Sequence, residues 1–153
     1  MSPNMANIRE ISDDTWDRTE HDWSDKSFYY VSVTFLLGKP LGLDGKLEEL
    51  NRDVRKGGYK IKNPMILIQH GKFKGRIMIE IEKKDLYDSQ VFTYDPQTAC
   101  DTIVHNGGIS GLGKGIDRLR ERVAARRISE PREIYYMYQP DPNSTKTVLF
   151  AIT

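Results

Sequence analysis

Residues 37–54, LGKPLGLDGKLEELNRDV, have a counterpart in residues 106–123, NGGISGLGKGIDRLRERV. Both segments place a glycine-rich turn before a helix with apolar residues at helical spacing. An offset of 69 positions (107 − 38) aligns them without a gap and pairs Gly38 with Gly107, Gly42 with Gly111, Leu43 with Leu112, Leu47 with Ile116, Leu50 with Leu119 and Val54 with Val123. We interpret the match as an internal duplication.

The segments on either side of the two helices have the composition of strands. Aromatic and β-branched residues dominate FYYVSVTFLL (28–37) and CDTIVH (100–105) before the helices. After the helices, the sequence predicts a hairpin in each half: MILIQ (65–69) with RIMIEIE (76–82), and EIYYMY (133–138) with TVLFAI (147–152). Each half is therefore predicted to be a strand–helix–strand–strand unit, and residues 90–94 a connecting strand.

We predict an α+β fold in which two such units form one antiparallel sheet. Both helices would cover one face of the sheet and leave a ligand cleft on the other. The domain would span residues 27–153, with repeats at about 27–84 and 90–153. Residues 1–26 are polar and are expected to form a flexible leader. In an alternative, Trp16 or Trp23 folds back over an apolar opening.

Composition limits the function classes. The chain has 153 residues and a formal net charge of +1, which gives no reason to expect nucleic-acid or membrane binding. One cysteine excludes an internal disulfide, and no signal or membrane-spanning segment is evident, so we expect a cytoplasmic protein. The three histidines and Cys100 are too far apart for zinc. We predict no metal and no cofactor.

The two halves differ in chemistry at matched positions. The offset pairs Glu133 with Pro64 and Tyr135 with Ile66, so the second half carries polar groups that the unit does not need. Strand alternation places Glu133, Tyr135 and Met137 on the face away from the helices. A carboxylate among aromatic rings could bind a cation or act as a general acid or base. Alternatively, Glu133 begins an exposed strand and forms a surface pair.

Further side chains are candidates for the walls of the cleft. The aromatic candidates are Tyr29, Phe35, Tyr59, Phe92 and Tyr94. His105 is a candidate because it lies beside the glycine-rich loop, although a strand-end hydrogen-bonding role is the alternative. That loop, residues 108–115, is close to the phosphate-binding pattern but has glycine at its final position, where serine or threonine is required. We therefore favour a turn of the repeat over a nucleotide site.

The run from His105 to Ile152, with its H-N-G-G and P-R-E-I-Y segments, resembles the gyrase-inhibitor-like (GyrI-like) family. This family includes effector-binding domains of bacterial multidrug-sensing regulators. The resemblance covers about residues 27–153 and implies the tandem fold described above. It also implies that Glu133 faces a central cavity and pairs with cationic aromatic ligands. Some members are similar in fold but hydrolyse electrophilic cyclopropane-containing natural products, for which Glu133 and Tyr135 are the candidates here.

Three functions follow as expectations. The first is a standalone binding protein for aromatic, amphiphilic, cationic small molecules, with no catalysis. The second is a hydrolase for electrophilic natural products that uses Glu133 and Tyr135. The third is a gyrase-inhibitor-like module that binds a protein through an exposed edge or through the arginine-rich helix 118–127, for which a solvated helix face is the simpler interpretation. A homodimer is a further open expectation.

Overall fold

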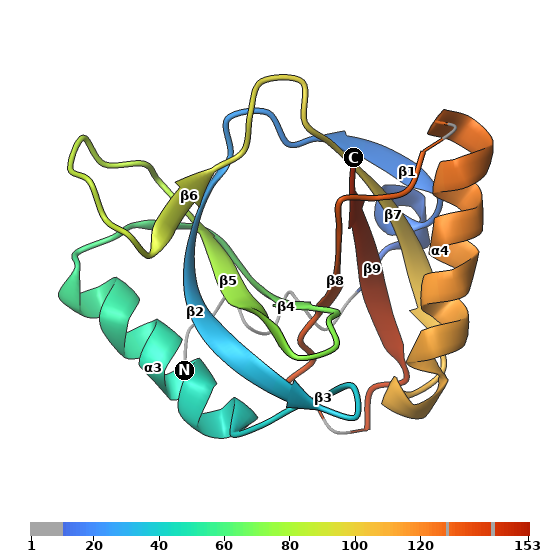
Figure 1. Ribbon diagram of the computed structural model, residues 1–153, viewed down its shortest axis with the longest axis horizontal. Helices are drawn as coiled ribbons and strands as arrows, with labels where there is room; N and C mark the ends of the chain where they lie inside the picture. Colours follow the sequence, from blue (N-terminus) through green and yellow to red (C-terminus); the bar gives the residue numbers. More distant parts are fainter. Residues whose placement is uncertain (1–10, 128, 142) are drawn as a thin grey trace.

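The computed structural model describes residues 11–127, 129–141 and 143–153. In this part of the chain one strongly curved antiparallel sheet is flanked by two long helices on its outer side (Figure 1). The helices are α2 (Asp13–Trp16), α3 (Leu43–Lys56) and α4 (Leu112–Arg127), with a 3-10 turn, η1, at Ile109–Gly111. The strands are β1 (Thr19–Asp22), β2 (Ser27–Leu36), β3 (Lys39–Pro40), β4 (Ile61–Gln69), β5 (Lys74–Ile81), β6 (Val91–Thr93), β7 (Ala99–Asn106), β8 (Glu133–Met137) and β9 (Lys146–Ile152).

The strand order is mirrored about the middle of the sheet. It runs β1-β7-β9-β8-β4-β5-β2-β3, and β6 pairs with β2. Within the sheet, the second half runs β7, β9, β8 and the first half runs β4, β5, β2. The middle strands β8 and β4 therefore pair at the centre, and the first strands β7 and β2 lie farthest from it among these six. The α+β fold with a large antiparallel sheet is confirmed, whereas descent of its halves from a duplication stays a prediction.

Strand alternation separates the core into clusters on the two faces of the sheet. On the outer face, Ile77 and Ile79 of β5 pack with Leu50 and Val54 of α3. The corresponding cluster of the second half packs β7, β8 and β9 against α4. The inner face carries one cluster that joins both halves, including Leu67 and Met78 from the first, and Tyr135, Phe150 and Ile152 from the second.

The expectation that residues 1–26 form a flexible leader is corrected for the described part, residues 11–26. Thr19–Asp22 is a strand that pairs with Ala99–Thr102 at the edge of the sheet. Trp23 is buried in the inner-face cluster, and Trp16 packs against that cluster. The polar composition hid this because a four-residue edge strand has solvent on one side. Residues 1–10 of the leader lie outside the described residues.

Candidate functional site

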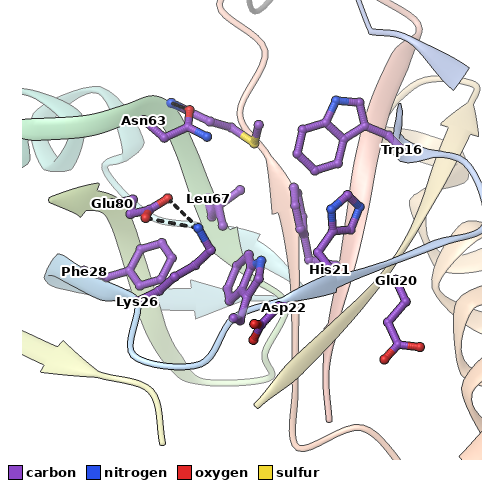
Figure 2. Close-up of a pocket in the computed structure, with 12 residues that line it drawn as sticks. Trp16, Glu20, His21, Asp22, Lys26, Phe28, Asn63, Leu67 and Glu80 are labelled. Carbon is purple, nitrogen blue, oxygen red and sulfur yellow. Dashed lines mark hydrogen bonds and ion pairs between the residues drawn. The ribbon is translucent and has the colours of Figure 1, made fainter. Parts of the chain in front are cut away.

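The inner face of the sheet carries a cavity of about 360 Å³. Its aromatic walls are Trp16, Trp23, Phe28 and Phe150, and Met65 and Leu67 add apolar surface. Figure 2 shows Trp16 and His21 on one side, with Phe28, Lys26 and Glu80 facing them across the space. The volume lies in the range of small-molecule sites, and the wall combines four aromatic rings with polar and charged side chains.

An ion pair lies within the cavity lining. Lys26 Nζ contacts the two carboxylate oxygens of Glu80 at 3.3 and 3.1 Å (Figure 2). Glu80 is buried, and a buried carboxylate is stable only when paired. Asp22 adds a second carboxylate, and hydrogen bonds from the side chain and backbone of Ser24 hold the pKa of Asp22 below its usual range.

The wall that β1 contributes is held by charges on α4. Arg126 and Arg127 each contact both Glu20 of β1 and Asp101 of β7, at distances between 2.7 and 3.2 Å. Asp101 is fully buried, so its carboxylate depends on these two guanidinium groups. In addition, Arg122 donates to the backbone carbonyl of Arg18. Three arginines of the predicted solvated helix face therefore bind the chain's own N-terminal segment.

Glu133 lies on the same inner face but does not line the cavity. Its carboxylate accepts three bonds: from Arg76 Nη2 at 2.5 Å, from the Tyr94 hydroxyl at 3.0 Å and from the Tyr135 hydroxyl at 3.2 Å. The Arg76 guanidinium in turn lies 4.3 Å from the Phe92 ring centroid. The cation expected from a ligand is thus supplied here by the chain itself.

The two phenols that contact Glu133 remain hydrogen-bond donors. Burial, with the neighbouring Tyr135 and Glu133 groups, raises the pKa of Tyr94. Burial and the charge of Glu133 likewise raise the pKa of Tyr135 well above its ordinary value. Tyr94 also contacts Trp23, with ring centroids 5.5 Å apart, and Trp23 lines the cavity. Glu133 therefore lies one aromatic layer behind the cavity.

The predicted ligand-binding residues divide between the two faces. The structure brings Tyr135, Met137, Phe92 and Tyr94 together with Glu133 on the inner face. It places Tyr29, Phe35 and Tyr59 in the core under α3, so these three are corrected as wall residues. The physical reason is alternation: in β2, Phe28 faces inward, and Tyr29 and Phe35 therefore face the helix.

His105 is also corrected, since it is buried beneath α4 and away from the cavity lining. Its two ring nitrogens are buried without a hydrogen-bond partner among the described residues. A Cβ at Gly115 would lie 2.6 Å from His105 Nδ1. Packing against His105 thus accounts for the glycine that ends the phosphate-like pattern.

The tryptophans Trp16 and Trp23 line the cavity, in keeping with the alternative in which one of them folds back over an apolar opening. The other lining residues were missed by sequence reasoning. Glu80 could have been found, because it alternates with Ile79 and Ile81 and so faces inward. His21, Asp22 and Lys26 gave no usable signal, since their position depends on the long-range pairing of β1 with β7.

In the described ranges, no group of histidine, cysteine, aspartate or glutamate side chains is arranged to hold a metal ion. No helix of that same part of the chain has the length and apolar character to span a membrane.

No family model and no curated protein matches this sequence. Among solved structures, the chain is similar to a crystal structure of a hydrolase from Listeria innocua. The TM-score is 0.53 at 10% identity, and the match covers 90% of this chain and 93% of the other. At this identity the similarity concerns the fold alone.

Proposed function

We propose that this protein binds an aromatic, amphiphilic, cationic small molecule in the inner-face cavity. The observation that carries the proposal is that aromatic rings and carboxylates line one space of about 360 Å³. Flat aromatic walls suit an aromatic ligand and attract cations through their faces. The GyrI-like resemblance favours the same class of ligand, although it places the cation at Glu133.

The charge of the lining favours a cation. Of the three carboxylates in the lining, Glu20 is paired with Arg126 and Arg127 and Glu80 with Lys26, so Asp22 leaves one negative charge in excess. Burial lowers the pKa of His21, which keeps the ring neutral at pH 7. Glu80 is the most buried of these carboxylates and has Lys26 as its ion-pair partner. A ligand ammonium group would share Glu80 with Lys26 or displace it. Glu133 is already held by Arg76, so we place the cation at Glu80 instead.

Binding can be measured with the chain's own fluorescence, because its two tryptophans both line the cavity. We expect tetraphenylphosphonium to change tryptophan emission and neutral triphenylphosphine oxide to bind about tenfold more weakly. Glu80→Gln should lose that preference. Glu82→Gln, an exposed carboxylate just beyond β5, is the matched control and should keep it. Equal binding of the cation to wild type and Glu80→Gln would contradict the proposed charge recognition.

Hydrolysis is a second candidate, favoured by the Glu133 cluster and by the similarity in fold to a hydrolase. Glu133 would take a proton from a water that attacks the cyclopropane carbon of a ring fused to a dienone. The carbon–carbon bond would break toward the dienone, whose oxygen would receive a proton from Tyr135. The substrate would have to displace Arg76 from Glu133.

The hydrolase hypothesis is tested by following ring opening of a cyclopropane-fused dienone by absorbance. Glu133→Gln and Tyr135→Phe should each abolish turnover. Glu80→Gln should retain most of the turnover, because Glu80 takes no part in the proposed proton transfers. Turnover that persists in Glu133→Gln excludes this mechanism. The protein-binding and homodimer expectations remain predictions.

A further inference from the structure

His21 is a polar group of the cavity that neither proposed function uses. It lies on β1, lines the cavity, and its ring centroid is 4.9 Å from that of Trp16. Its Nε2 lies 2.9 Å from the Thr19 hydroxyl and 3.1 Å from the Thr102 hydroxyl. These two contacts decide which ring nitrogen carries the proton.

Each threonine hydroxyl has one proton and lies beside a backbone carbonyl that can only accept, and the two hydroxyl oxygens are also 3.0 Å apart. Thr19 donates to the Thr15 carbonyl at 2.8 Å, and Thr102 donates to the Trp16 carbonyl at 2.7 Å. These carbonyls belong to the last residues of α2, where helical carbonyls have no partner within the helix. If either hydroxyl turned its proton toward His21, a carbonyl would lose its donor.

The arrangement therefore makes His21 Nε2 the donor and the two hydroxyl oxygens its acceptors. Nδ1 is then the ring atom with the lone pair. It has no hydrogen-bond partner among the described residues, and it is not one of the fully buried side-chain atoms that lack partners there. Nδ1 is thus not fully shielded from solvent, on a ring that lines the cavity.

We infer that His21 Nδ1 accepts a hydrogen bond from the ligand, which makes the cavity selective for protonated amines that carry at least one N–H. The inference rests on the proposed cation-binding function and names its ligand class. Glu80 attracts any cation, whereas a lone pair can recognise only a cation with a proton to donate. Burial lowers the pKa of His21, which favours the neutral ring that the acceptor role needs.

A matched pair of probes separates the two effects. N,N-dimethyl-2-naphthylmethylamine carries one N–H when protonated, and its N-methylated quaternary analogue carries none. By titration calorimetry with the wild-type chain at pH 7.5, we expect the tertiary amine to bind about tenfold more tightly. His21→Phe should bind both equally, at the affinity of the quaternary analogue. Equal affinities in wild type would overturn the role of His21 and leave the cation site standing; binding of neither probe would overturn both.

The tautomer can be tested without a ligand. The chain has three histidines, and nitrogen-15 chemical shifts of an imidazole distinguish the Nδ1–H from the Nε2–H form. The signals that disappear in His21→Phe belong to His21, and they should show a protonated Nε2 and an unprotonated Nδ1 at pH 7.5. A protonated Nδ1 at that pH would overturn the inference even if the probes differed in affinity.

Discussion

At the scale of single residues, Arg76 decides what Glu133 can do. The guanidinium is held by the carboxylate on one side and by the faces of Phe92 and Tyr30 on the other, at 4.3 and 5.5 Å. A cationic aromatic ligand would be held in the same way. The chain thus fills its own cation site with a side chain 57 positions away in the sequence.

Arg76→Met should destabilise the protein by about 2 kcal/mol, because Glu133 would keep two phenol donors but lose its charged partner. Urea unfolding measures the change. The double variant with Glu133→Gln should cost less than the sum of the two single variants, since the lone carboxylate is then gone. Additive effects would show that Arg76 and Glu133 are not coupled.

His21 should make the protein less stable in mild acid. Burial, and then the charge of Lys26, lowers its pKa from the ordinary value of 6.5, against an opposing effect of Asp101. As the pH falls below 6.5, the unfolded chain takes up a proton before the folded one, so stability is lost from there toward the lower, folded-state pKa. Between pH 7 and pH 5, His21→Phe should show a smaller drop in unfolding free energy than wild type. An unchanged drop would contradict this assignment.

At the scale of elements, α4 shows why two neighbouring glycines of one helix are not equivalent. A Cβ at Gly115 would lie 2.6 Å from His105 Nδ1 and 2.9 Å from Leu149 Cδ1, whereas a Cβ at Gly113 would meet nothing within 4 Å. The helix packs against His105 at Gly115 and faces open space at Gly113. Close packing, more than phosphate binding, explains the glycine at 115.

Substituting each of these glycines by alanine gives opposite results. Gly115→Ala should destabilise the protein by about 1–3 kcal/mol through overpacking. Gly113→Ala should stabilise it by about 0.5–1 kcal/mol through helix propensity. Thermal unfolding followed by circular dichroism measures both variants. A stabilised Gly115→Ala variant would show that the contact with His105 does not constrain α4.

The attachment of β1 depends on the network that joins Glu20 and Asp101 to two arginines of α4. Asp101→Asn should destabilise the protein by about 3 kcal/mol, because two guanidinium groups lose a fully buried partner. Glu82→Gln, in an exposed pair with Lys60, should change stability by less than about 0.5 kcal/mol. Hydrogen exchange should show faster opening of β1 in Asp101→Asn alone. Equal protection of β1 in both variants would argue against the network.

The sequence predicted most elements because their signals are local. The alternation of Arg76–Ile81 and the helical spacing in α3 and α4 place strands and helices within a few residues of their observed ends. The same alternation located Glu133 and Tyr135 on the inner face. It could not reveal β1, whose pairing joins residues about 80 positions apart, or the pairing of Glu133 with Arg76.

At the scale of the whole molecule, the inner-face cluster makes the two halves interdependent. Leu67 and Met78 of the first half share one core with Tyr135 and Phe150 of the second, and β4 pairs directly with β8. Neither half can bury its inner face alone. The described domain should therefore unfold in one cooperative transition.

Phe150→Ala tests this cooperativity. Phe150 is almost fully buried in the cluster that joins the two halves, and its ring contacts both Trp16 and Trp23. We expect a loss of about 3–5 kcal/mol. The transitions followed by far-ultraviolet circular dichroism and by tryptophan fluorescence should shift together. Ile109→Ala, at an exposed side chain, should leave both unchanged. Transitions that separate in Phe150→Ala would show that the halves fold independently.

The short strand β1 has a consequence for how copies of the chain behave toward one another. It pairs with Ala99–Thr102 of β7, and just beyond it the side chain of Asp17 accepts the backbone N–H of Val104. Together they cover an outer strand that carries apolar residues such as Ile103 and Val104. Release of the N-terminal segment would present this strand's edge to other chains as a template for intermolecular pairing. We therefore expect the ion pairs that position a cavity wall to protect the protein against aggregation as well.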